Sequence, residues 1–296
     1  MPTPDNVGVR QVNYQGNQRM SETPLAVARH YGRDGLIRRL LVALSEAGKD
    51  IEHLSIDDLA PVDEFHSRRR RATEELARLL APTATDRVVD IGSGLGGPAR
   101  YLAATYGCRV SGVDLTPEFV AAATELTRRS GLAGTVDFQV GSALALPLPD
   151  AGFDLGWTQN VAMNIADRAR WYAEMHRALK PGGRLAIQDV AQGPGGALHY
   201  PVNWADTAEL SFLRTPEETR AELAAAGFVV QAWEDHSAVA IAEMAAERAA
   251  AGGAGRPALG LHLVVGESFR EKMRNSRRNM LEGRTLLINA VVVRDG

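Results

Sequence analysis

The chain has 296 residues, which is longer than a typical single domain and shorter than two full ones. Its 45% apolar and 23% charged residues are ordinary globular composition and exclude a collagen-like or wholly disordered chain. The formal net charge of −3 gives no basic field for holding nucleic acid, so no nucleic-acid partner is expected. A single cysteine, Cys108, excludes an internal disulfide framework and a multi-cysteine zinc site.

The N-terminal segment is expected to carry no targeting signal. Residues 1–10 have neither the basic patch nor the apolar core of a signal peptide, and no run approaches the roughly 18 apolar residues that span a bilayer. We therefore expect a cytoplasmic location and no membrane contact. Residues 1–20 are polar and without pattern, which predicts a mobile arm.

Residues 21–80 are predicted to form an N-terminal helical cap. The apolar spacing over residues 25–47 indicates helix, broken into two by Gly32 and Gly35. A loop around Pro61 is expected next, followed by a helix that ends near residue 80.

Residues 81–296 alternate short apolar runs with amphipathic stretches, which is typical of a doubly wound parallel sheet. The run Arg87–Ile91, bounded by turn residues, has the composition of a buried parallel strand. Further strands are predicted at 108–113, 135–140, 153–158, 184–190, 228–233 and 286–293. Helices are predicted at 98–106, 117–129, 167–179, 215–226, 237–250 and 267–282, the fourth beginning with a Thr-Pro-Glu-Glu capping box.

A glycine-rich loop, residues 90–97 (DIGSGLGG), lies between the first predicted strand and its helix. Glycines let the backbone turn sharply and let a ligand approach without a side chain in between. The spacing of Gly92, Gly94 and Gly97 also fits GxGxxG, which leaves NAD or FAD open as the ligand. Asp114 ends the next strand about 20 residues later, where a carboxylate accepts the ribose hydroxyls of an adenosine in either kind of cofactor.

The carboxylate of Asp90 helps to separate these cofactors. It would repel a pyrophosphate, whereas it suits a ligand that carries an ammonium and a sulfonium cation. Two later motifs agree with this choice: Phe153-Asp154 opens the fourth strand, and residues 179–183 (LKPGG) precede the fifth. With these motifs in this order, residues 60–235 resemble the class I S-adenosylmethionine-dependent methyltransferases.

The resemblance implies S-adenosylmethionine as the cofactor and a Rossmann-like, seven-stranded sheet whose last strand is antiparallel. It also implies an N-terminal helical lid and a helical insertion before the last strand, with segments 192–214 and 237–283 covering the substrate. Asp114 would hold the ribose, and Ser142 stands where the family often has a carboxylate that reads the adenine. The implied cofactor residues are Asp90, Gly92, Gly94, Asp114, Leu115, Ser142, Ala143 and Asn160.

Phe65-His66 followed by Ala72-Thr73 resembles the small-molecule branch of the family, which includes sarcosine/dimethylglycine N-methyltransferases and ubiquinone-type C-methyltransferases. Many members of that branch have a Gly-Gly pair after Phe-His, where this chain has Ser67 and four arginines at 68–71. We interpret the arginines as a solvated helix face from which one side chain reaches the cofactor carboxylate. A nucleic-acid patch is the alternative, although no aromatic residue is interleaved with them.

The segment after the fifth strand is the predicted acceptor site, because ligands of open α/β sheets bind beyond the carboxyl ends of the strands. His199 is a candidate general base there, and His66 is the other candidate. Trp157 and Trp233, on predicted strands, are expected in the core. The residues predicted to contact the acceptor are Met163, Asn164, Tyr200, Trp204 and Phe212.

The sequence therefore predicts an enzyme that methylates a small molecule, with nitrogen as the favoured acceptor atom and oxygen close behind. No metal is expected, since no cluster has ligand spacing. An NAD-dependent oxidoreductase and a non-catalytic S-adenosylmethionine-binding protein are the alternatives. A monomer or a homodimer is expected.

Overall fold

The structure, a computed structural model, describes residues 35–251, 258–265 and 268–296. The predicted mobile arm, residues 1–20, and the predicted helix before Gly35 lie outside the described residues. The division into a cap (21–80) and a main domain (81–296) remains a prediction.

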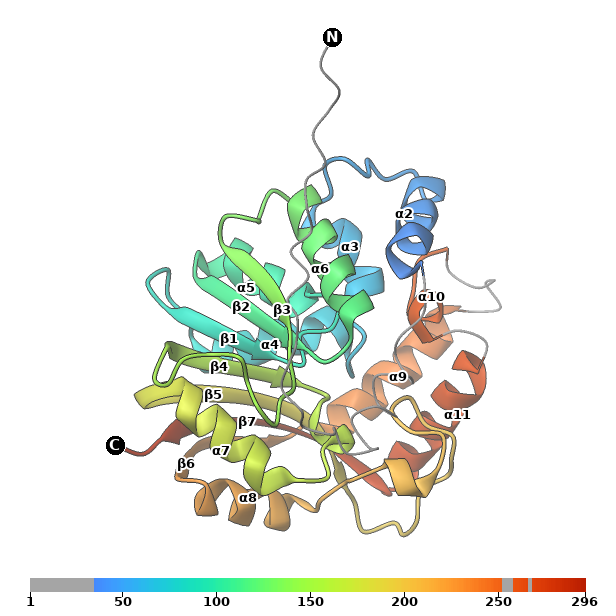
Figure 1. The fold of residues 1–296 in the computed structure, drawn as a ribbon. Helices are drawn as coiled ribbons and strands as arrows, with labels where there is room; N and C mark the ends of the chain where they lie inside the picture. The colour runs from blue at the N-terminus through green and yellow to red at the C-terminus, as the bar shows by residue number, and fades with distance from the viewer. Residues whose placement is uncertain (1–34, 252–257, 266–267) are drawn as a thin grey trace.

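One mixed sheet of seven strands organises the described part of the chain, in the order β3-β2-β1-β4-β5-β7-β6 (Figure 1). The strands are β1 (Arg87–Ile91), β2 (Arg109–Asp114), β3 (Val136–Val140), β4 (Phe153–Gln159), β5 (Leu179–Gln192), β6 (Phe228–Asp235) and β7 (Thr285–Arg294). Strands β1 to β5 pair in parallel, and β7 runs antiparallel to both β5 and β6. The predicted strands and the antiparallel last strand are therefore confirmed.

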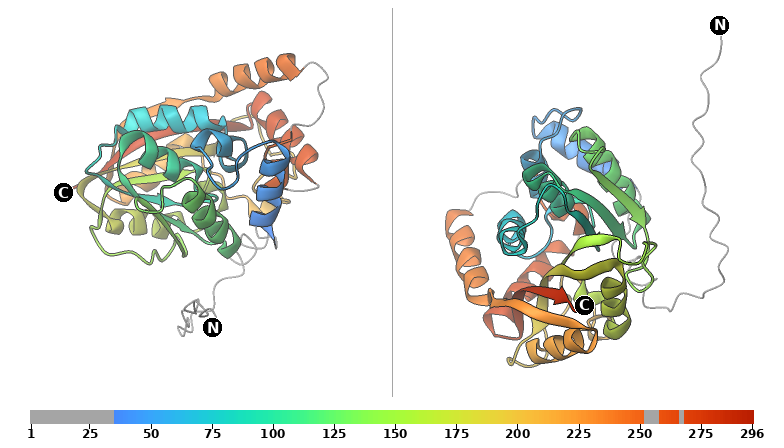
Figure 2. Two further views of the ribbon diagram at one scale, coloured as in Figure 1. Left: turned by 90° about the horizontal axis from the view of Figure 1, so that it is seen from above. Right: turned by 90° about the vertical axis from the view of Figure 1, so that its left-hand side faces the viewer.

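Helices cover both faces of this twisted sheet (Figure 2). One face packs against α4 (Arg69–Leu80), α5 (Gly97–Tyr106) and α6 (Pro117–Arg129), and the other against α7 (Arg168–Ala178) and α8 (Pro216–Ala225). Neighbouring positions of one strand serve the two faces, since Val88 packs toward α4 and α5 whereas Val89 packs in the cluster that contains α7. This alternation makes the central strand β1 apolar on both faces, whereas the edge strand β3 keeps an exposed polar residue.

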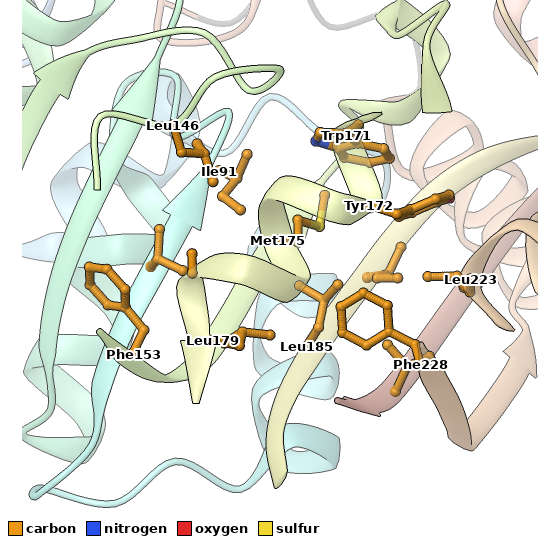
Figure 3. Packing of buried hydrophobic residues seen from close by; sticks show 14 of the residues in the cluster. Ile91, Leu146, Phe153, Trp171, Tyr172, Met175, Leu179, Leu185, Leu223 and Phe228 are labelled. Atoms are coloured by element: carbon orange, nitrogen blue, oxygen red, sulfur yellow. The ribbon is translucent and has the colours of Figure 1, made fainter. Parts of the chain in front are cut away.

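The core under α7 and α8 is built from large side chains (Figure 3). Trp171 and Tyr172 pack with ring centroids 5.0 Å apart, and Met175 and Phe153 complete the layer. Full burial stabilises a side chain such as Phe or Met by roughly 1.5–3 kcal/mol relative to exposure. Trp157 and Trp233 also pack as predicted, Trp157 fully buried on the opposite face and Trp233 against this cluster.

The prediction of a loop around Pro61 is wrong, because this proline lies inside α3 (Ile56–Asp63). A capping box starts this helix: the Ser55 hydroxyl accepts from the Asp58 backbone N–H, and the Asp58 carboxylate accepts from that of Ser55. The proline removes one intrahelical hydrogen bond of this eight-residue helix, and the cap and the burial of Leu59 and Val62 in an apolar cluster stabilise it. The predicted capping box of α8 is confirmed, with Thr215 and Glu218 bonded reciprocally.

Two helical segments lie at the edge formed by the carboxyl ends of the parallel strands. The first consists of α2 (Leu36–Glu46) and α3, which pack against α6. The second lies between β6 and β7 and consists of α9 (Ser237–Ala251), α10 (His262–Val265) and α11 (Phe269–Leu281), gathered on the right in Figure 1. Two single 3-10 turns, Ala162–Asn164 and Ala208–Leu210, complete the described elements. None of the described helices has the length and apolar character needed to cross a membrane.

Candidate active site

A cavity of about 380 Å³ opens beyond the carboxyl ends of the parallel strands. The loops after β1, β2, β3 and β4 line one side of it, and α9 and α11 line the other. Strand order reverses between β1 and β4, and ligands of open α/β sheets bind at such a switch point. The cavity therefore lies where the sequence predicts a ligand site.

The glycine-rich loop presents bare backbone to this cavity. Gly92 and Gly94 have φ angles of +78° and +53°, a region that favours glycine. A Cβ atom on Gly92 would collide with Val161, and one on Gly94 would lie 2.8 Å from the Phe65 ring. Both positions therefore exclude a side chain, and a bound molecule can approach the backbone closely.

Asp114 ends β2 and lines the cavity next to that loop. Its Oδ2 accepts the Gly94 N–H at 2.8 Å, and its Oδ1 accepts the Thr116 N–H at 2.9 Å. These two bonds fix the carboxylate and leave each oxygen free to accept from a ligand hydroxyl. Burial raises the pKa of Asp114 above its ordinary value.

Several buried side-chain oxygens that face no donor belong to residues lining the cavity, among them Asp90 Oδ2, Asn160 Oδ1 and Asn164 Oδ1. A buried polar group without a partner costs about 1–3 kcal/mol, so these oxygens fit a ligand that brings N–H donors. The pKa of Asp90 is raised to about 8 by burial, by the nearby charge of Asp114 and by that of Glu64. S-adenosylmethionine carries an ammonium group, which supplies N–H donors and positive charge, and a sulfonium, which supplies positive charge. Its cationic end therefore fits these unpartnered oxygens.

The other predicted cofactor residues also reach the cavity. Leu115 and Ala143 line it, and Ser142 lines it while its Oγ accepts the Leu144 N–H at 3.2 Å. Asn160, with φ +53°, follows β4 and donates its side-chain N–H to Ser67 Oγ at 3.2 Å. All eight residues predicted for the cofactor therefore line one cavity, and together they fit an adenosyl cofactor.

Among the predicted acceptor residues, Met163, Asn164 and Trp204 line the cavity, whereas Tyr200 and Phe212 do not. Tyr200 packs against the buried cluster that includes Trp204. The Phe212 backbone N–H donates to Met163 O at 2.9 Å, so this residue supports the cavity wall from behind.

His199 is not among the residues that line the cavity. Its Nε2 lies 2.9 Å from Glu282 Oε2, and its backbone exchanges two hydrogen bonds with the Asn279 side chain. His199 therefore ties the segment 192–214 to α11, and in this structure it is not brought to the cofactor residues.

His66 lines the cavity and is 9% exposed. Its Nε2 lies 2.7 Å from Glu64 Oε2, and Arg70 donates to Glu64 Oε1 at 2.6 Å. Burial by itself would raise the pKa of Glu64, but the His66 hydrogen bond and the charges of His66 and Arg70 lower it to about 2. An ionised Glu64 can only accept, so Nε2 of His66 donates to it and Nδ1 is the ring nitrogen not engaged by Glu64. Nδ1 lies 3.3 Å from the Ser67 carbonyl oxygen and 3.4 Å from Gln159 Nε2, and both contacts are long for hydrogen bonds.

The interpretation of residues 68–71 as a solvated helix face is wrong for two of the four arginines. The Arg68 side chain is 3% exposed and makes paired hydrogen bonds to both Glu75 and Glu243, at 2.6–3.0 Å. Arg70 is held by Glu64 and lies over the Tyr101 ring. The partner Glu243 lies on α9, so local spacing in the sequence gave no sign of it.

Several site residues were missed from the sequence. Gln159 could have been found, since it is the last residue of β4 and therefore lies at the ligand-binding edge. Glu64 and Ser67 carry no such signal, because a loop between two helices has no periodicity. In the described ranges, no group of three side chains that could hold a metal ion occurs.

The chain is similar in sequence to known methyltransferases. A family described as a methyltransferase domain matches residues 89–187. Sarcosine/dimethylglycine N-methyltransferase of Halorhodospira halochloris is 30% identical over 200 residues, which cover 66% of this chain and 70% of that protein. Methyltransferase GfsG of Streptomyces halstedii is 38% identical over 136 residues, 46% of this chain. The chain spans only 47% of GfsG, and about a third of the next two curated relatives it matches.

The fold has a solved counterpart in geranyl diphosphate C-methyltransferase from Streptomyces coelicolor. The TM-score is 0.67 at 18% identity, with 93% of this chain and 98% of that chain covered. Three structural features fit the methyltransferase family named by these relatives: the sheet order, the glycine loop and the carboxylate of Asp114. The chain belongs to the class I S-adenosylmethionine-dependent methyltransferases.

Proposed function

We propose that the protein methylates a hydroxyl group of a small-molecule acceptor, with His66 as the general base. The observation that carries the proposal is the buried His66–Glu64 pair in the wall of the cofactor cavity. A hydroxyl must lose a proton as it is methylated, so it benefits from a base, whereas a neutral amine does not. This places oxygen before nitrogen, the reverse of the order favoured from sequence.

The proposal assigns separate roles to the residues that hold the cofactor and to His66. Bound S-adenosylmethionine supplies an electrophilic methyl group on a sulfonium, and holding donor and acceptor in line supplies about 7–11 kcal/mol. Asp114 and the loop at 92–94 hold the adenosyl end, and Asp90 faces the cationic end. His66 takes the hydroxyl proton on Nδ1, and the Ser67 carbonyl oxygen, 3.3 Å away, accepts the resulting N–H.

Methylation of an amine is the second candidate. It is supported by the relative named sarcosine/dimethylglycine N-methyltransferase, which is 30% identical to this chain. The NAD-dependent oxidoreductase has no support from the comparisons, which name methyltransferases. We further propose a cytoplasmic monomer or homodimer without a nucleic-acid partner, on the basis of composition and charge.

Calorimetry and label transfer test the proposal together. We expect S-adenosylhomocysteine to bind and NADH not to bind. With methyl-labelled S-adenosylmethionine and a panel of alcohols, phenols and amines, we expect label in the hydroxyl compounds. Label confined to amines would favour the second candidate. Cofactor binding without any transfer would favour a non-catalytic S-adenosylmethionine-binding protein.

Asp90 is expected to release a proton when S-adenosylmethionine binds. With a pKa of about 8 the carboxyl group is mostly protonated at pH 7, and a cation beside it favours the ionised form. Affinity should therefore rise as the pH increases from 6 to 8 and level off above that. Calorimetry at pH 7 in two buffers of different ionisation enthalpy should give a release of nearly one proton. The Asp90→Asn variant should release none, and equal release in both proteins would contradict the assignment.

A further inference from the structure

The helices between β6 and β7 each turn one face toward the cavity. On α9 the lining residues are Ala240, Glu243, Met244 and Glu247, at spacings of three, four and seven. On α11 the lining residues include Phe269, Met273 and Met280, again on one face of the helix. Ala240, Met244 and Met280 also pack with Leu287 of β7 in a small apolar cluster, so the sheet anchors this wall of the cavity, which we call the acceptor side.

The opposite wall of that side is also apolar. Met163 follows β4, and Trp204 lies in the segment after β5, 2% and 7% exposed respectively. The acceptor side is thus lined by four methionines and two aromatic rings: Met163, Met244, Met273, Met280, Trp204 and Phe269. Methionine is flexible and polarisable, and surfaces rich in it accommodate large, irregular apolar ligands.

Charged residues also line the cavity, and carboxylates outnumber arginines among them. Arg68 is fully engaged by Glu75 and Glu243, so its guanidinium is not free to hold a ligand carboxylate. Glu247 and Arg277, on the neighbouring helices α9 and α11, contribute one charge of each sign. Arg69 and Asp167 do the same elsewhere on the cavity wall. A small zwitterion would lose the hydration of both of its charged groups against the methionine side chains of this wall.

From this lining we infer that the acceptor is a bulky, uncharged molecule with an extended apolar body, and not a glycine derivative or another small zwitterion. The inference rests on the proposed function, since it names the substrate class of the same site. It concerns the acceptor side alone and is independent of whether oxygen or nitrogen is methylated.

A series of phenols with growing 4-alkyl chains measures the apolar character directly. Phenol, 4-methyl-, 4-ethyl- and 4-butylphenol are titrated calorimetrically into protein saturated with S-adenosylhomocysteine, and sarcosine is titrated separately. Each buried methylene should tighten binding about fourfold. Sarcosine should show no heat of binding at millimolar concentration. Affinity that does not change with chain length, or sarcosine binding more tightly than phenol, would overturn the inference.

Matched variants show whether the effect arises at this wall. Met244→Gln and Met273→Gln should flatten the dependence on chain length and leave the affinity for S-adenosylhomocysteine unchanged. Val239→Gln and Leu281→Gln, on the same helices at positions 45% and 52% exposed, do not line the cavity and should keep the wild-type dependence. The same steep series in all four variants would overturn the inference. Failure to bind S-adenosylhomocysteine would instead refute the proposed function, so the two failures are distinguishable.

Discussion

Replacing His66 with glutamine is expected to lower kcat for a hydroxyl acceptor by about 10²–10⁴-fold, the usual contribution of a positioned base. Glutamine still offers an N–H to Glu64, so the buried carboxylate keeps a donor in addition to Arg70 and Thr73. The Kd for S-adenosylhomocysteine and the Tm should therefore stay close to the wild-type values. Steady-state kinetics over a pH range, with calorimetry as the control for binding, measure this effect.

Glu64 is a positioning residue in this scheme, and Glu64→Gln separates that role from simple packing. Loss of the negative partner disfavours the imidazolium that forms during the reaction, so kcat should fall. The acidic limb of the pH–rate profile should move to lower pH, which a purely structural role does not require. A wild-type pH profile in both variants would remove His66 and Glu64 from the reaction.

Substitution of Asp114 by alanine is expected to weaken S-adenosylmethionine and S-adenosylhomocysteine binding at least tenfold. A hydrogen bond to a charged group contributes roughly 1.5–3 kcal/mol, which corresponds to about 10- to 150-fold in affinity. Alanine also leaves the Gly94 and Thr116 N–H groups without their acceptor, so part of the loss reflects a looser loop. Calorimetric titration with S-adenosylhomocysteine measures the change.

Asp114→Asn separates the two contributions, because the amide oxygen can still accept one of the backbone N–H groups. A control for the general loss of a carboxylate is Asp137→Ala on the neighbouring β3, where the side chain is exposed and bonds only to Ser111 among the described contacts. This control should bind as the wild type does. Unchanged affinity in both Asp114 variants would refute the ribose role.

The sheet could be predicted because its strands are short apolar runs between turn residues. The largest boundary difference is at β5, predicted to begin at 184 and beginning at Leu179 in the structure. Leu179 pairs with Phe153 before the regular register with β4 starts, across an irregularity between Phe153 and Leu155. The Lys-Pro-Gly-Gly sequence by itself indicates a turn. The strand begins earlier in the structure because Leu179 pairs with Phe153 of β4, a contact that the local sequence does not reveal.

The cofactor side could be predicted for a related reason. Residues that end parallel strands meet at one edge of the sheet, so chain order alone places Asp114 and Asn160 near the glycine loop. No comparable rule of strand order places the residues of the acceptor side. His199 is directed by its contacts with Asn279 and Glu282, and Arg68 by a glutamate 175 residues further along the chain. Contacts between segments so distant in sequence leave no periodic pattern to read.

The position of α9–α11 between two paired strands has an evolutionary consequence. Asp235 and Ile288 are register partners of β6 and β7, so the sheet itself holds the two ends of the intervening stretch together. Because closing a longer loop costs little more than closing a shorter one, this stretch can be lengthened, shortened or exchanged while the sheet stays intact. Changes within this one contiguous block can therefore alter the helical wall of the acceptor side, while Met163, Trp204 and the cofactor residues stay as they are.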